Sequence, residues 1–599
     1  MKIKNILMAA MFAGVGATFT SCEDFTDLSP IDSFTDKSYW KTADDLKMYA
    51  TGFYGLLSSP SATLDGTSDN FVSRSASGWL FDESTVPTYA SQSSWTWDWI
   101  RDCNYFFSRY QTVQASEKDV NKYVGEMRFF RSLLYFSKIK TFGDVPWYDR
   151  DLQTNDTEEL YKGRDPRDMV LGKVIEDLKF AIEWLPEKNS AEKGRLHKDA
   201  ARQQLARVCL YYGTYMKYHN ETPTTDWTAD KLLKEAADQT DAIINSGNYD
   251  IVKASDADAD TKASEGYPLA YANLFVMKDH SNCKESVLSR FYQEGVLSHE
   301  TGRQEGGNGY GLTKDFIESF LMKDGTPIYN AGSGYKGDNN QENEIADRDP
   351  RLYQLIPNKH KPELVLANGD VQFPVLPDVN AGAGVTGYPC TKFHSANSKQ
   401  AEARNTYYDW FIYRYAEVLL INAEAKAELG LCTQEVLDKT INKLRDRVDM
   451  AHLTTTPVAD SKPIDYGYSL SNLIYEIRRE RRIELVHEGF RLDDLKRWNG
   501  MKVLDNPKTM FGIKVTDEVA RMYKEIGNIE FGNANEEGKR PVVEYEGAKY
   551  LYHYAGSRDL DATRSGRHWK ENDRRWLDPL PKEELLLNKN LKQNPGWTE

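Results

Sequence analysis

Residues 414–430, RYAEVLLINAEAKAELG, and residues 476–498, EIRRERRIELVHEGFRLDDLKRW, decide the fold that we predict for this chain. In the first stretch the apolar residues recur at helical spacing and Gly430 provides a stop signal. Small residues such as Ala423 and Ala427 let a second helix approach closely, as it does in tetratricopeptide-type repeats. The two stretches therefore predict helices that pack in pairs.

The same periodicity continues on both sides of these stretches. Asp165-Pro166 is a typical helix start, because it combines a capping side chain with a proline in the first turn. We expect long helices over the following ranges: 118–142, 165–186, 196–218, 229–246, 410–430, 434–449 and 471–489. No strict 34-residue repeat is present, so the repeat assignment depends on the rhythm of helix pairs. The prediction is a mainly α fold with a scaffold of four tetratricopeptide-like helix pairs.

Long polar segments rich in Gly, Ser, Asn and Asp separate the predicted helices. The longest run over about 58–96, 376–408 and 500–560. Irregular segments of this length in a compact protein are usually functional or disordered. We therefore expect a loop-rich second layer that carries the ligand site, together with a few short strands such as 285–291.

The first 22 residues, MKIKNILMAAMFAGVGATFTSC, have the pattern of a secretory signal peptide. Lys2 and Lys4 precede an apolar stretch that is too short and too rich in glycine to form a membrane-spanning helix. Residues 19–22, Phe-Thr-Ser-Cys, resemble a bacterial lipobox, in which cleavage leaves the cysteine as a lipidated N-terminus. We expect a lipoprotein signal peptide at 1–21, lipidation at Cys22, and a mature chain of 22–599 tethered to a membrane.

The charge balance excludes one broad class of function. The chain has 76 Lys+Arg against 91 Asp+Glu, a formal net charge of -15. Polyphosphate recognition requires clustered basic residues, so we do not expect a nucleic-acid partner. The five cysteines after Cys22 are widely spaced and form no C-x-x-C pair, which disfavours a disulfide framework or a zinc site.

No catalytic or nucleotide-binding motif is present in the sequence. H-E-x-x-H, G-x-S-x-G and the phosphate-binding loop pattern are all missing. Asp256, Asp258 and Asp260 alternate as in a calcium loop, but Thr261 replaces the turn glycine and Tyr267 the bidentate glutamate. We expect a solvated acidic loop, with calcium as the alternative, and otherwise no cofactor, no metal site and no enzyme activity.

The aromatic residues are more informative about a ligand. Trp95, Trp97 and Trp99 lie within five residues, just before or at the start of an amphipathic helix. Trp99 lies next to the apolar stripe of that helix and is expected in the core. Trp95 and Trp97 precede it, and both an exposed stacking platform and core packing remain open for them. Four further candidates complete the predicted ligand-binding set: Trp79, Tyr310, Arg74 and Asn104.

Several motifs together resemble the SusD/RagB family of outer-membrane nutrient-binding lipoproteins of Bacteroidetes. They occur in the family's order along the whole mature chain, and the strongest are the two stretches quoted at the outset. The others are the lipobox, SPIDSFTDKSYWKTADDLKMYATGFY at 29–54, EMRFFR at 126–131, FGDVP at 142–146, RDPRL at 348–352 and the tail from Leu577 to Trp597. Acidic residues just after Cys22 also resemble the surface-export signal of such lipoproteins.

The resemblance implies a fold, a place and a partner. It implies one SusD-like domain over 22–599, in which an N-terminal part of about 22–300 and a C-terminal part of about 310–599 are intertwined. It also implies a lipid-anchored protein on the cell surface that captures oligosaccharide, or another nutrient, for a SusC-like TonB-dependent transporter. Ligand sites of the family lie in variable loops, so Trp95, Trp97 and Asn104 are placed near the usual site.

Two other readings of the sequence remain. One is a helical-repeat adaptor for a protein or peptide, with all the aromatic residues in the core. The other is a glycoside hydrolase, for which no pair of carboxylates stands out. Charged residues recur at i, i+3 and i+4 along 476–484, and we expect them to form ion pairs that support the helix and nearby loops rather than to contact a ligand. They are Glu476, Arg478, Arg479, Glu480, Arg481, Arg482 and Glu484.

Overall fold

The computed structural model describes residues 39–255, 261–304, 309–380, 384–558 and 567–598. Cys22 and the run from Asp256 to Asp260 lie outside these ranges. The α-helices are α1 (Ala43–Thr51), α2 (Asp98–Phe107), α3 (Glu117–Phe142), α4 (Thr157–Leu160), α5 (Arg167–Trp184), α6 (Lys198–His219), α7 (Ala229–Asn245), α8 (Ala270–Leu274), α9 (Thr301–Gln304), α10 (Lys314–Glu318), α11 (Gln341–Ile345), α12 (Arg351–Leu355), α13 (Tyr415–Glu428), α14 (Gln434–Lys439), α15 (Ile441–Arg447), α16 (Asn472–Glu484), α17 (Arg491–Arg497), α18 (Asp517–Gly527) and α19 (Lys582–Leu587).

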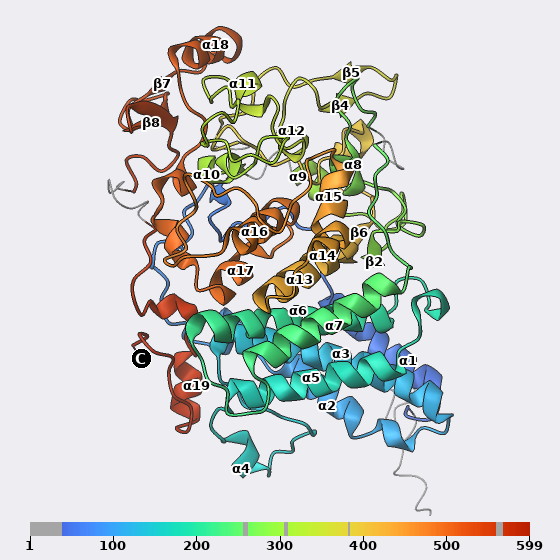
Figure 1. The fold of residues 1–599 in the computed structure, drawn as a ribbon. Coiled ribbons are helices and arrows are strands. Elements are labelled where there is room, and N and C mark those ends of the chain that lie inside the picture. The colour runs from blue at the N-terminus through green and yellow to red at the C-terminus, as the bar shows by residue number, and fades with distance from the viewer. Residues whose placement is uncertain (1–38, 256–260, 305–308, 381–383, 559–566, 599) are drawn as a thin grey trace, which may run out of the picture.

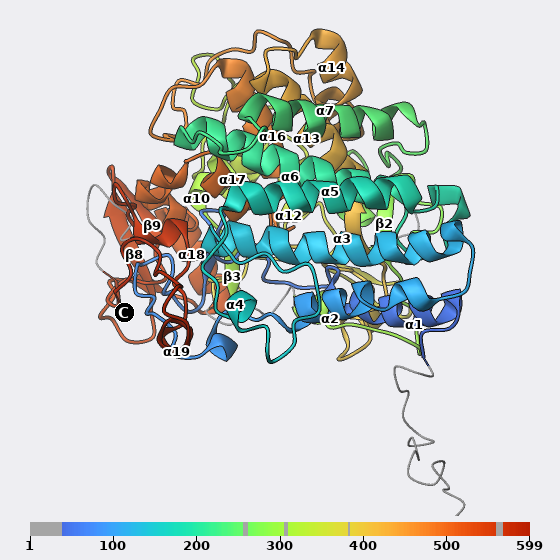
Figure 2. The same ribbon diagram turned by 90° about the horizontal axis from the view of Figure 1, so that it is seen from below.

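The predicted helical scaffold is confirmed. Helix α3 packs on α5, α5 on α6, and α6 on α7, and Figure 2 shows these four as successive rows. Helix α13 continues the stack, since it packs against α7 and α16. One large apolar core runs through the stack, from Leu46 in α1 to Leu444 in α15. The loop-rich layer lies beyond α13 and α16 and contains the short helices and most of the strands (Figure 1).

The strands are short and join distant parts of the chain. Strand β1 (Phe71–Ser73) pairs with β3 (Tyr310–Leu312), and β2 (Ser286–Arg290) pairs with β6 (Trp410–Arg414), both antiparallel. The remaining strands form two small local sheets: β4 (Leu364–Val365), β5 (Val371–Gln372), β7 (Phe531–Gly532), β8 (Arg540–Tyr545) and β9 (Ala548–Leu551). The first two pairings connect the N-terminal and C-terminal parts of the chain.

Three of the expected helix boundaries are wrong. Residues 410–414, WFIYR, form β6 rather than the first turn of α13, because aromatic and β-branched side chains suit a strand and β2 supplies a pairing edge. The segment 434–449 is interrupted at Thr440, whose backbone (φ -126°, ψ -94°) is not helical. Helix α16 ends at Glu484, five residues before the glycine that we took as its stop.

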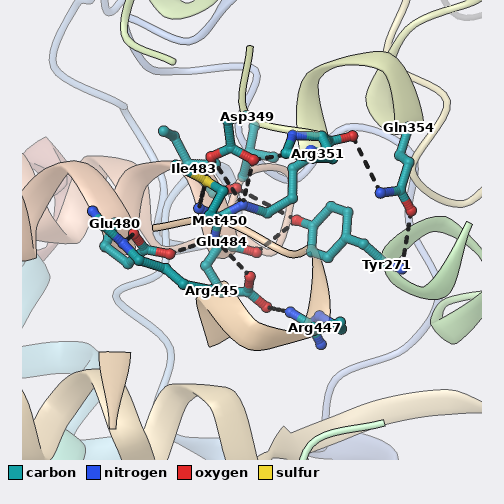
Figure 3. Close-up of polar contacts among 12 residues, drawn as sticks. Tyr271, Asp349, Arg351, Gln354, Arg445, Arg447, Met450, Glu480, Ile483 and Glu484 are labelled. Atoms are coloured by element: carbon teal, nitrogen blue, oxygen red, sulfur yellow. Dashed lines mark hydrogen bonds and ion pairs between the residues drawn. The ribbon is translucent and has the colours of Figure 1, made fainter. Parts of the chain in front are cut away.

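The charged residues of α16 are buried, although the sequence alone does not reveal it. Every residue from Glu476 to Glu484 is buried. Within the helix Glu476 pairs with Arg479 at 3.3 Å, but most partners come from distant loops and helices. Figure 3 shows the centre of this cluster, where two carboxylates of α16 meet arginines of other segments: Glu480, Glu484, Arg351, Arg445 and Arg447. The expected structural role in supporting nearby loops is confirmed.

None of the helices in the described ranges combines the length and the apolar character that a membrane span requires.

Candidate ligand-binding site

Three of the predicted ligand residues line one cavity. Trp95, Trp97 and Asn104 border a space of about 460 Å³ between α2, the segment after α3, and α19. Figures 1 and 2 show α4 close to α19, at one side of the helical stack. The rest of the lining is mainly apolar, with rings from Tyr148 and Tyr161. A concave, mostly apolar space of this size with a few polar groups is typical of a small-ligand site.

The two tryptophans have different surroundings. Trp95 is 2% exposed and packs edge-on against Phe142 at 4.9 Å, so its ring belongs largely to the core. Trp97 is half-buried, and its ring lies edge-on to Trp95 at 5.3 Å and to Tyr148 at 5.5 Å. Such edge-to-face pairs hold a ring in one orientation. Trp97 is therefore the better placed of the two to offer a fixed ring to a ligand.

Trp99 does not lie in the core as we expected. Its side chain is 43% exposed and meets Phe53 edge-on at 5.1 Å. The buried stripe of α2 is centred on Ile100, Cys103 and Asn104, and Trp99 lies at its flank. The helix begins at Asp98, as expected, but the stripe that faces α3 does not extend as far round as Trp99.

Asn104 organises the site from beneath. Its side chain is 1% exposed, and Nδ2 donates to the carbonyl of Tyr148 at 2.9 Å. Its Oδ1 accepts from Arg131, whose guanidinium also makes two hydrogen bonds to Asp177. The amide is thus committed at both ends and fixes the Tyr148 segment against α2. This geometry favours a positioning role over direct contact with a ligand.

Lys138 supplies a buried cation next to the rings. Its Nζ donates to the carbonyl of Ser94 at 3.0 Å and lies 4.5 Å from the centre of the Trp97 ring. Burial lowers the pKa of Lys138 to about 8, with only partial compensation from Asp98. Burial also raises the pKa of Tyr148 to about 12, so its hydroxyl stays protonated at neutral pH.

Replacing Lys138 with Met is expected to remove a pH-dependent part of the unfolding free energy. The pKa of Lys138 is about 8 in the fold and 10.5 in the unfolded chain. At pH values between these two, the unfolded chain binds more protons than the folded protein, so the wild-type free energy of unfolding rises with pH. At about 1.4 kcal/mol per pKa unit, the difference between wild type and Lys138→Met should grow by about 3 kcal/mol across this window and stay level below it. Urea titrations at several pH values measure it.

Lys439→Met is the control for this experiment. Lys439 is exposed, and its hydrogen bond to Glu435 raises rather than lowers its pKa. The difference in unfolding free energy between wild type and Lys439→Met should therefore stay constant over the pH range in which the difference for Lys138→Met grows. A level curve for Lys138→Met as well would contradict the lowered pKa.

The far wall of the cavity comes from segments that sequence reasoning missed. Leu160 ends α4, Leu587 ends α19, and both line the cavity with Leu591. Glu584 of α19 faces the same space, and burial, helped by Glu583, raises its pKa. Leu160 lies 63 positions and Leu587 490 positions from Trp97 in the chain, so tertiary packing and not a local pattern brings them to the cavity.

The other three predicted residues lie elsewhere. Trp79 packs against Trp569 with ring centres 5.9 Å apart, and Lys496 lies 5.2 Å from the centre of its ring. Tyr310 pairs with Ser73 in the β1–β3 sheet. The side chain of Arg74 is exposed, and its carbonyl accepts a hydrogen bond from His553. None of the three borders the cavity beside Trp97, so the six candidates do not form a single site.

Two further cavities are more polar. One of about 430 Å³ lies between α3, α6 and β6, and its Arg207 and Glu417 side chains are paired with each other. Another of about 560 Å³ lies beside α10 and α16, where Lys508 pairs with Glu318. Both of these ion pairs are made within the protein, and we take the cavity beside Trp97, whose lining is more apolar, as the candidate site.

Comparison with known proteins decides the family. The sequence profile described as "SusD family" matches residues 251–597, more than half of the chain. This chain belongs to the SusD family. A second profile, described as "Starch-binding associating with outer membrane", matches residues 36–210 of this SusD-family chain. The resemblance that the motifs indicated is thereby confirmed.

Relatives and solved structures agree with this assignment. The SusD-like protein P2 of Formosa agariphila is 23% identical over 516 residues, which cover 83% of this chain and 90% of that protein. The starch-binding protein SusD of Bacteroides thetaiotaomicron is 26% identical over 36% of this chain and 42% of its own. The crystal structure of a SusD-like protein from Bacteroides fragilis covers 95% of this chain and 100% of its own, with a TM-score of 0.67 and 24% identity. That likeness shows a shared fold.

Proposed function

We propose that this SusD-family chain binds an oligosaccharide in the cavity beside Trp97. The observation that carries the proposal is the half-buried Trp97 ring, held edge-on by Trp95 and Tyr148 in a space of about 460 Å³. Planar rings pack against the C–H faces of sugars, while a few polar groups take the hydroxyls. A starch-binding relative and a solved neighbour named as a SusD-like carbohydrate-binding protein support this ligand class.

We further propose how the protein is placed in the cell. A lipid on Cys22 would anchor it in the outer membrane, exposed at the surface, and the family description that mentions the outer membrane supports this location. The protein would deliver its ligand to a SusC-like TonB-dependent transporter. Residues 22–599 would act as one domain, which the β1–β3 and β2–β6 pairings between its two parts support. The role is capture and release, without catalysis.

Trp97→Ala is expected to weaken oligosaccharide binding by tenfold or more, about 1.4 kcal/mol. Removing the ring leaves the sugar face without its packing partner, while Trp95 and the core beneath remain. Isothermal titration against a panel of oligosaccharides, first with the wild type and then with the variant, measures the effect.

Trp99→Ala is the matched control, because Trp99 lies two residues away, is 43% exposed and does not border the cavity. Its affinity for the sugar should equal that of the wild type. An unchanged affinity in Trp97→Ala would favour the peptide-adaptor alternative or another cavity. If no oligosaccharide binds the wild type and no transporter barrel copurifies, the proposed function is wrong. Release of product from the panel would instead reveal a hydrolase.

A further inference from the structure

The mouth of the cavity exposes large apolar side chains to solvent. Leu160 is 39% exposed, Tyr161 50% and Leu587 63%, and all three line the cavity. Single exposed apolar residues are common, but a group of them around one concave space marks a binding surface. We call these three residues the apolar rim.

The rim is held in place by hydrogen bonds between its two sides. The Nδ2 of Asn588, just after α19, donates to the carbonyl of Lys162 at 2.9 Å. The Nδ2 of Asn590 donates to the carbonyl of Tyr161 at 2.6 Å. These bonds tie the end of α19 to the segment after α4, and both views show the two helices in the same region (Figures 1 and 2). The two sides of the apolar rim are therefore fixed relative to each other by side-chain hydrogen bonds.

Three of the polar side chains that line the cavity are already bonded within the protein. Both ends of the Asn104 amide are used, and the Oδ1 of Asn588 accepts from the backbone of Asn590 at 3.0 Å. Arg150 makes two hydrogen bonds to Asp156. A bare sugar has several hydroxyls that need partners when they leave water, and burying them unpaired is unfavourable. The lining is mainly apolar, and the apolar rim adds exposed apolar surface at the mouth.

We propose that the cavity takes a glycan that carries an aromatic acyl ester. The sugar would lie against Trp97, and the aromatic acyl group would cover Leu160, Leu587 and Tyr161. This inference rests on the proposed function and adds the substituent. A small aromatic group fits better than a flat protein surface, because the three rim residues border a concave space that continues to Trp97. Tyr161 also offers a ring for edge-on or offset packing.

Matched sugar pairs test the proposal. Maltotriose, cellotriose, xylotriose and mannotriose are each titrated as the free sugar and as the mono-feruloyl ester. The ester of the sugar that binds should bind about tenfold more tightly than the free sugar, because it buries the apolar rim. Leu587→Ser should remove most of this advantage, so that the ester and the free sugar bind the variant with nearly equal affinity.

Leu586→Ser is the matched control. Leu586 is adjacent on α19 and 68% exposed, but it does not border the cavity, so the variant should retain the full ester advantage. Equal affinity for the free sugar and its ester would overturn this inference and leave the proposed function standing. Binding by neither form of any sugar would count against the proposed function itself. Loss of a copurifying barrel in both leucine variants, with unchanged ester binding, would reassign the rim to a protein partner.

Discussion

Glu484→Gln is expected to lower the free energy of unfolding by about 3–5 kcal/mol, the cost of removing one partner from a buried ion pair. The Glu484 carboxylate bonds to Arg447 and lies 2.8 Å from Arg414 and 3.2 Å from Arg351, and all four side chains are at most 2% exposed. A neutral amide of the same shape preserves the packing. The substitution removes a negative charge, so the buried guanidinium groups of Arg351, Arg414 and Arg447 lose a carboxylate partner.

The pH dependence has a definite sign. Burial opposes the ionisation of Glu484, but Arg447, Arg414 and Arg351 outweigh it, so its pKa lies well below the usual 4.5. A carboxyl with a lowered pKa in the fold contributes stability above the pKa of the unfolded chain and loses it as the pH falls. The difference between wild type and Glu484→Gln should therefore be full at neutral pH and shrink as the pH drops below about 4.5.

The shift in the urea midpoint, followed by helical circular dichroism, measures this effect. Glu435→Gln makes the same chemical change in the pair with Lys439, where the side chains are 74% and 59% exposed. That exposed pair is expected to contribute far less than the buried one, because solvent screens it. Equal shifts in the two variants would show that the cluster around α16 does not behave as a buried network.

Cys22→Ala is expected to remove the protein from the outer-membrane fraction. One acyl chain gives only marginal, reversible binding, whereas several chains, at about 0.8 kcal/mol per buried CH₂, hold a protein firmly. The variant should lose the acyl mass in intact-protein mass spectrometry, and its share of the outer-membrane fraction should fall to near background.

Cys432→Ala is the control for this variant. Cys432 is half-buried, whereas the other cysteines of the described ranges are buried, so it is the accessible alternative for modification. It should stay acylated and in the membrane fraction like the wild type. Acylation that persists in Cys22→Ala and disappears in Cys432→Ala would move the anchor to the other cysteine.

The helices were predictable because their signals are local. Capping residues, glycine stops and apolar spacing place α3, α5, α6 and α7 within two residues of the expected ends. The strand at residues 410–414 was not predictable, because a run of aromatic and β-branched residues suits a helix or a strand until β2 supplies a pairing partner. The long-range pairing outweighed the local pattern there.

Three of the six predicted ligand residues line the candidate site, for the same reason. Trp95, Trp97 and Asn104 lie within ten positions, so one turn and one helix bring them together. Leu160 and Leu587 were missed, because an exposed leucine on a short helix carries no signal of its neighbours. Trp79 and Tyr310 were chosen for their loop context, and that context does not reveal which surface a loop covers.

The sequence by itself determined the family and the helical scaffold, because family motifs and helix signals are short runs of neighbouring residues, and it predicts a secretion signal at 1–21. Only the tertiary structure decided that the charges of Glu476–Glu484 lie in the interior and that α19 closes the cavity beside Trp97. Burial and cavities are properties of packing between distant segments. The sequence pattern of a charged helix is the same whether the helix is exposed to water or buried among arginines from other segments.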